Sequence, residues 1–173
     1  MNLRSVVGIP LLALVGATLV GCAGYHLGPT NGTAAGEKSI EVRPFANTTL
    51  EPRLVDPVTS TLRRSLQQDG TFRLATDGGA DVVVNGTLID YKRGELGFQP
   101  NDTLTVRDYY IELTARVVAV ERSTGKTNLN RTVMGRTTIR VGSDLASSER
   151  QAAPILAADL ARNITSLLVD GTW

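Results

Sequence analysis

Two consecutive stretches with alternating side chains, residues 109–120 and 128–141, constrain the fold of this chain more than any other feature. A period of two places neighbouring side chains on opposite faces of a strand, so each stretch predicts a half-buried strand. The polar sequence Ser123-Thr124-Gly125-Lys126 between them predicts a tight turn. We therefore expect a long antiparallel hairpin with one apolar face. That face would hold Ile111, Leu113, Ala115, Val117, Leu129, Val133, Ile139 and Val141.

Two other segments have the periodicity of amphipathic helices. The first carries Leu54, Val58, Leu62 and Leu66 at intervals of four, with Pro52 suited to its first turn and Gly70 to its C-terminal stop. The second carries Leu156, Leu160, Ile164, Leu167 and Leu168. Its start is ambiguous: Ser148 and Gln151 have the spacing of a capping box, but the ring of Pro154 would clash with the preceding turn. We expect either a kink there or a start nearer Ala152.

The remaining apolar segments complete an α+β fold. Residues 39–45 and 82–91 have strand composition, so the chain order is strand, helix, three or four strands, helix. We predict a two-layer sandwich, in which two helices pack on one face of a mostly antiparallel four-stranded sheet. The other face would then remain uncovered and available to a partner. It would present Glu41, Arg43, Glu112, Thr114, Arg116, Arg136, Thr138 and Arg140.

The N-terminus has the pattern of an export signal. Arg4 precedes an apolar run over residues 6–20, which is too short for a typical membrane-spanning helix. The run ends in Leu19-Val20-Gly21-Cys22, which resembles the bacterial lipobox. That resemblance implies cleavage before Cys22, a diacylglycerol on its thiol and an acyl chain on its amine, which together would anchor the protein to a membrane. The alternative is an ordinary signal followed by a core cysteine.

Composition excludes several classes of function. The whole chain has a formal net charge of +1, and from Cys22 onward the basic and acidic residues are equal in number, which argues against nucleic acid as a partner. Its one His, His26, lies in a Gly-rich tether, and one His with one Cys cannot form a Cys/His metal cluster. Gly125-Lys126-Thr127 lacks the earlier glycine of a P-loop. We expect no cofactor and no enzymatic activity.

Residues 92–108 form the longest irregular segment predicted after the tether. Lys92, Arg93 and Arg107 lie at its ends and could clamp a phosphate group, because their side chains offer charge and directed donors. The alternative is that Lys92 pairs with Glu95, and Arg107 with Asp102 or Asp108, on the surface. Exposed pairs of this kind contribute little to stability.

Several sequence blocks together resemble the LptE family of lipopolysaccharide-assembly lipoproteins. They are the lipobox cysteine, Gly24-Tyr25-His26-Leu27-Gly28, the run Pro44-Phe45-Ala46-Asn47-Thr48-Thr49 after a short strand, and Asp69-Gly70-Thr71-Phe72-Arg73-Leu74. The similarity also covers residues 80–91 and 107–126. It divides the chain into a signal peptide (1–21), a lipidated tether (22–38) and one LptE-like domain (39–173).

The resemblance implies a two-layer domain seated inside the outer-membrane β-barrel LptD, which it helps to fold and to deliver lipopolysaccharide to the outer leaflet. Ala23 after the cysteine favours the outer membrane under enterobacterial sorting rules. In the family, basic residues near a loop between the middle strands contact lipopolysaccharide phosphates. No exact motif carries that role over, so Lys92, Arg93 and Arg107 are assigned to lipopolysaccharide by position and charge. The alternative function is a structural envelope lipoprotein that supports another complex without binding glycolipid.

Overall fold

The computed structural model describes residues 35–99, 102–141 and 144–171, so the predicted signal peptide and Cys22 lie outside the described residues. The last four residues of the predicted tether, 35–38, are hydrogen-bonded to the domain. Gly36 N–H donates to the Thr71 carbonyl at 3.0 Å, and Arg73 N–H donates to the Lys38 carbonyl at 2.9 Å. The elements are β1 (Ser39–Val42), β2 (Ala46–Asn47), the 3₁₀ turn η2 (Pro52–Leu54), α2 (Val55–Asp69), β3 (Arg73–Leu74), β4 (Val82–Gln99), β5 (Asp102–Glu121), β6 (Thr127–Arg140) and α3 (Leu145–Asp170).

The sheet is mixed and has six strands in the order β3-β1-β4-β5-β6, with β2 also paired to β4. The strands β4, β5 and β6 are antiparallel, whereas β1 runs parallel to β3 and β4, and β2 runs parallel to β4. The predicted α+β class is confirmed. The prediction of a mostly antiparallel sheet of four strands was wrong in detail. The missed strands are two residues long, too short to show a period of two, and α2 is the crossover that makes β1 and β3 parallel.

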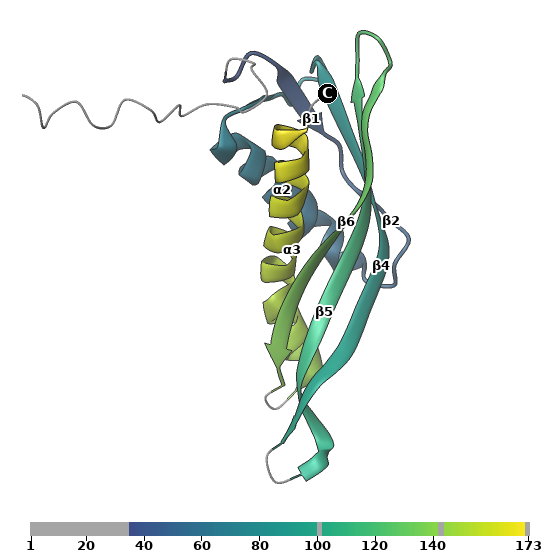
Figure 1. The fold of residues 1–173 in the computed structure, drawn as a ribbon, viewed down its shortest axis with the longest axis vertical. Helices are drawn as coiled ribbons and strands as arrows, with labels where there is room; N and C mark the ends of the chain where they lie inside the picture. The colour runs from purple at the N-terminus through teal and green to yellow at the C-terminus, as the bar shows by residue number, and fades with distance from the viewer. Residues whose placement is uncertain (1–34, 100–101, 142–143, 172–173) are drawn as a thin grey trace, which may run out of the picture.

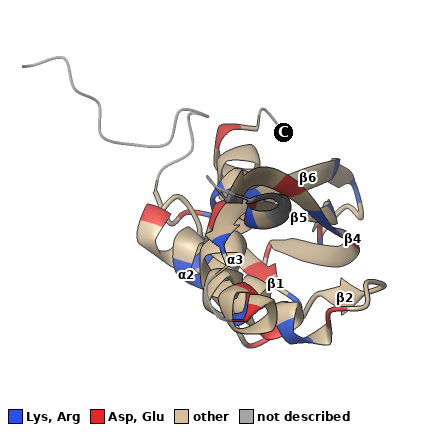
Figure 2. Cartoon of the chain, turned by 90° about the horizontal axis from the view of Figure 1, so that it is seen from below, with Lys and Arg blue, Asp and Glu red and all other residues tan. Residues whose placement is uncertain are grey.

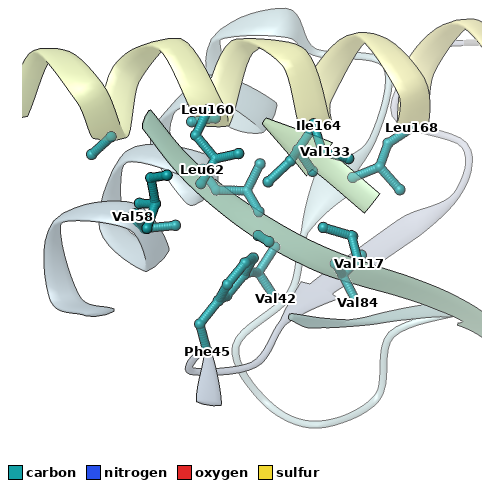
Figure 3. Packing of buried hydrophobic residues seen from close by; sticks show 14 of the residues in the cluster. Val42, Phe45, Val58, Leu62, Val84, Val117, Val133, Leu160, Ile164 and Leu168 are labelled. Carbon is teal, nitrogen blue, oxygen red and sulfur yellow. The ribbon is translucent and has the colours of Figure 1, made fainter. Parts of the chain in front are cut away.

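Both helices pack on one face of the sheet, as predicted, and no described segment forms a layer on the other face (Figure 1). The buried cluster combines the apolar faces of α2 and α3 with the inward side chains of the strands, among them Val42, Val84, Val117 and Val133 (Figure 3). Gly135 of β6 lies against the backbone of α3 at Leu160. A Cβ at this position would lie 2.6 Å from the Leu160 Cβ and 2.7 Å from its backbone nitrogen, so the helix packs this closely only over glycine.

The helix ends differ in how well the sequence predicted them. The first helix stops at Gly70, as predicted, with a left-handed φ of 77° and its N–H donating to the Leu66 carbonyl. The start of α3 was predicted wrongly, because the helix begins at Leu145 and not near Ser148 or Ala152. Asp144 is the N-cap, and its carboxylate accepts from Ala146 N–H at 3.2 Å and Ser147 N–H at 2.9 Å.

Within the described residues, α3 is also long and apolar enough to cross a membrane by length and composition alone. Most of its apolar side chains lie in the buried cluster with β5, β6 and α2, whereas Ile155 and Leu167, the latter predicted on the apolar face, are exposed. A core helix of a folded domain packs in this way. Its packing in the core therefore explains the length and apolar composition of α3 without a membrane. Pro154 lies inside the helix and is exposed.

The prediction that residues 92–108 form an irregular segment was wrong. β4 and β5 continue pairing through it to Gln99↔Asp102, with register shifts between Glu95 and Gln99. We name residues 92–108 the distal arm, and Figure 1 shows this hairpin end projecting beyond α3. Gly94 is a strand residue, and a Cβ on it would overlap the ring of Tyr110 across the pair. Glycine in a strand commonly marks such a close approach.

Candidate functional site

The three basic residues assigned from the sequence lie on the distal arm but on different faces of it. Lys92 is on the open face, opposite Glu112, whereas Arg93 points to the helix side and bonds to Glu149 of α3. Arg107 lies further along the arm, near Val141, whose N–H donates to the Arg107 carbonyl. The structure therefore brings them to one arm and does not gather them into one cluster.

Each of the three has a carboxylate partner. Lys92 Nζ lies 2.7 Å from Asp90 Oδ2, Arg93 Nη1 2.6 Å from Glu149 Oε1, and Arg107 Nη2 3.2 Å from Asp108 Oδ2. Surface pairing was one of the two alternatives considered; Asp108 was an expected partner of Arg107, whereas Asp90 replaces the expected Glu95. The hydrogen bonds that Lys92 donates to Asp90 and Arg93 donates to Glu149 raise the pKa of both basic groups, so both stay charged at neutral pH.

Asp108 joins the arm to the next strand. Its carboxylate accepts from Arg140 Nε at 2.9 Å and from Arg107, and these two hydrogen bonds, Arg140 first, hold the pKa of Asp108 below its ordinary value. One carboxylate therefore shares two guanidinium groups at this end of the sheet.

The open face carries the polar side chains predicted for it. The register aligns Lys92, Glu112 and Arg136 in one cross-strand row, with Thr114 opposite Met134 and Asp108 opposite Arg140. Basic and acidic residues are interspersed over the elements rather than gathered by sign (Figure 2). This agrees with the near-zero net charge of the chain.

The sequence did not predict that Gly94, Tyr110 and Arg136 stack on one another on this face. The Tyr110 ring covers Gly94 on one side, and the guanidinium carbon of Arg136 lies 4.2 Å from the ring centroid. Cation–π contacts of this kind contribute about 0.5–1 kcal/mol at exposed sites. The sequence placed Tyr110 and Arg136 on the same face but could not give the register that joins them.

The family model described as LptE, lipopolysaccharide-assembly, matches residues 37–168. The chain belongs to the LptE family. The match includes every strand and α2, and reaches almost to the end of α3, so it covers both the open face and the distal arm. No curated protein sequence matches the chain.

Three solved structures of similar proteins share the LptE chain's architecture. A minor lipoprotein of Acinetobacter baumannii has a TM-score of 0.50 at 17% identity, over 76% of this chain and 92% of that one. A hypothetical protein of Chlamydia trachomatis has a TM-score of 0.57 at 13% identity, over 79% and 98%. A protein of Xanthomonas campestris has a TM-score of 0.58 at 10% identity, over 83% and 90%. At these identities, the similarity shows a common fold.

Proposed function

We propose that this LptE-family chain is an outer-membrane lipoprotein that plugs and helps assemble an LptD-like β-barrel and assists delivery of lipopolysaccharide to the outer leaflet. The observation that carries the proposal is the family match over residues 37–168. In this proposal Cys22 carries the lipid anchor on the periplasmic side of the outer membrane. The protein contributes binding and positioning, and no catalytic step is assigned to it.

The open face supports the proposed seat inside a barrel. Large outer-membrane barrels have polar interiors, so a plug needs a surface that stays hydrated or hydrogen-bonds to polar side chains. The outer positions of β5 and β6 meet this requirement with Glu112, Arg116, Thr132 and Arg136. Their mixed signs allow pairing with either charge on the lumen wall, and the intermolecular pairs would be protected from bulk water.

The distal arm supports the proposed contact with lipopolysaccharide. Its Lys92, Arg93 and Arg107 can donate to phosphate oxygens once they leave their carboxylate partners. Leu96 and Phe98 on the same arm are 53% and 48% exposed. Side chains of both kinds on one projection match a ligand that joins phosphates to acyl chains.

Co-purification tests this function. The full lipidated chain should bring an LptD-like barrel with it from detergent-solubilised outer membranes, and the isolated pair should bind purified lipopolysaccharide. A Cys22→Ala variant is the matched control, since it loses the anchor but keeps the domain. A wild-type preparation with neither barrel nor glycolipid would contradict the proposal and leave the structural envelope lipoprotein as the function.

A further inference from the structure

The edge of β4 beyond β2 has no neighbouring strand within residues 35–99, 102–141 and 144–171. β2 pairs with β4 only as far as Leu88, whose carbonyl accepts from Thr48 N–H at 2.9 Å, and β4 then pairs with β5 alone. The bulge after Leu88 changes which residues of β4 face this edge. From there the outward backbone groups belong to Tyr91, Arg93 and Glu95, and no hydrogen bond among the described residues reaches them.

Two cavities lie along this free edge and meet at Leu50, Glu51 and Tyr91. The first, of about 530 Å³, follows the edge between the loop at Thr48–Glu51 and the segment from Ile89 to Arg93. The second, of about 580 Å³, lies between that loop, Tyr91 and the first turns of α3. We name the two cavities together the edge groove. An extended chain placed in the first would run beside β4 and could direct one side chain into the second.

The second cavity combines apolar walls with Tyr91 and a charged rim. Leu54, Pro57, Ala153 and Pro154 line it, and Leu50 at its mouth is 97% exposed. Burial, with the negative charges of Glu149 and Glu51, raises the pKa of Tyr91 to about 12. The phenol is therefore neutral and able to donate a hydrogen bond. Such a cavity suits an aliphatic side chain that enters beside a backbone carbonyl.

The rim of the second cavity carries two arginines from different elements. Arg53 of η2 and Arg150 of α3 are both exposed, and neither has an ion-pair partner among the described residues. Glu51 and Glu149 also line this cavity, but the charge of Glu149 is already paired with Arg93. An acidic ligand would therefore gain more at this rim than a basic one.

We propose that the edge groove binds an extended, acidic segment of a partner polypeptide, which adds as a strand to β4 at Tyr91–Glu95 and places an aliphatic side chain beside Tyr91. In this mode, main-chain hydrogen bonds supply affinity, and a pocket for an alternate side chain supplies specificity. Strands in the wall of a closed barrel have no free edge, so the segment belongs to a loop or a tail. A second copy of this chain would bring the same two rim arginines and so lacks the complementary charge. The proposal goes beyond the barrel-plug function and does not depend on it.

Defined peptides test the site on the full chain in detergent micelles. The probe is a fluorescein-labelled nine-residue peptide of alternating Val and Thr with a Glu at each end, and its counterpart has Lys at both ends. Binding is followed by fluorescence anisotropy, and amide hydrogen exchange is measured at Tyr91, Arg93 and Glu95.

Three variants alter the three parts of the groove, each with a matched control. Glu95→Pro removes an outward N–H without touching the ladder to β5, and Glu95→Ala keeps that N–H. Ala146→Phe fills the second cavity, whereas Gln151→Phe adds the same ring on an exposed position of α3 outside it. Arg53→Glu with Arg150→Glu reverses the rim, and Arg64→Glu reverses an exposed charge on α2.

The acidic peptide should bind more tightly than the basic one and should slow exchange at the three edge amides. Glu95→Pro and Ala146→Phe should each weaken binding about tenfold, the effect of losing one hydrogen bond or one side-chain site, while their controls leave it unchanged. Equal binding to variants and controls would overturn the proposal. So would a concentration-dependent dimer that Glu95→Pro abolishes, or anionic phospholipid vesicles that bind through the groove when neither peptide does.

Discussion

At the scale of single residues, the exposed ion pairs of the distal arm decide how it can bind an anion. The side chain of Lys92 is 63% exposed and that of its partner Asp90 is 41% exposed, so water screens their attraction. Pairs that are this exposed contribute little to stability, and a phosphate that competes for the cation therefore loses little by displacing the carboxylate. The pairs hold the cations in place and still allow exchange.

We therefore predict that replacing Lys92, Arg93 and Arg107 with Ala weakens lipopolysaccharide binding by about ten- to a hundredfold and makes the remaining binding less sensitive to salt, since charge-assisted hydrogen bonds are lost. The free energy of unfolding should change little, because solvent reaches all three of the lost pairs. Titration of the purified variant with lipopolysaccharide at two salt concentrations measures both effects.

The control for this variant carries the same loss of charge elsewhere. Arg64, Lys126 and Arg131 are exposed residues outside the distal arm, and their replacement with Ala should leave binding unchanged. If both triple variants lose affinity equally, overall charge explains the effect and the three arm residues have no specific role.

At the scale of elements, side chains of α3 form hydrogen bonds with the free edge of β6. Asp159 Oδ2 accepts from Arg136 N–H at 2.9 Å, and Asn163 Nδ2 donates to the Met134 carbonyl at 2.8 Å. Both contacts flank Gly135, where a Cβ would overlap Leu160 of the helix. An unprotected edge strand is a template for pairing with another chain, so these side chains close the middle of an otherwise available edge.

Replacing Asp159 and Asn163 together with Ala should expose this edge and produce self-association through β6. Sedimentation of the double variant should show a concentration-dependent larger species that the wild-type chain lacks. Gln151→Ala with Ser166→Ala alters two exposed residues of the same helix and should leave the oligomeric state unchanged. A double variant that stays monomeric at high concentration would show that the two contacts are not what keeps β6 unpaired.

At the scale of the whole molecule, the sequence predicted the elements whose apolar residues repeat with a regular period. It failed for the elements whose conformation depends on tertiary contacts. The β5–β6 hairpin and the stripe of α2 were correct because their apolar residues repeat over many positions. Two-residue strands such as β3 have no period to detect. Residues 92–108 were predicted to be irregular because the sequence does not show that β4 and β5 continue to pair through them, with Tyr110 covering Gly94. For the site, the basic residues were found, but their separation onto two faces depends on a bulge and a register that no local pattern gives.

The elongation of the sheet beyond the helices makes the arm separable from the domain. Gly94 and Tyr110 are directly opposite, and the neighbours beyond them whose side chains are described, residues 95–98 and 106–109, include none of the fully buried core. Joining Gly94 to Tyr110 through an Asn-Gly turn, which favours a tight hairpin, should therefore leave the domain folded. We expect the shortened chain to lose about 1–3 kcal/mol in free energy of unfolding, because Tyr109 packs on the core and Ile139 loses its partner.

Under the proposed function, the shortened chain should still co-purify with the barrel through its open face and should bind lipopolysaccharide at least tenfold more weakly. A chain of full length in which Leu96 and Phe98 are replaced by Ser provides the control for the arm's apolar residues. Loss of the barrel with retention of lipopolysaccharide binding would reverse the two assignments, placing the barrel contact on the arm and the glycolipid on the rest of the domain.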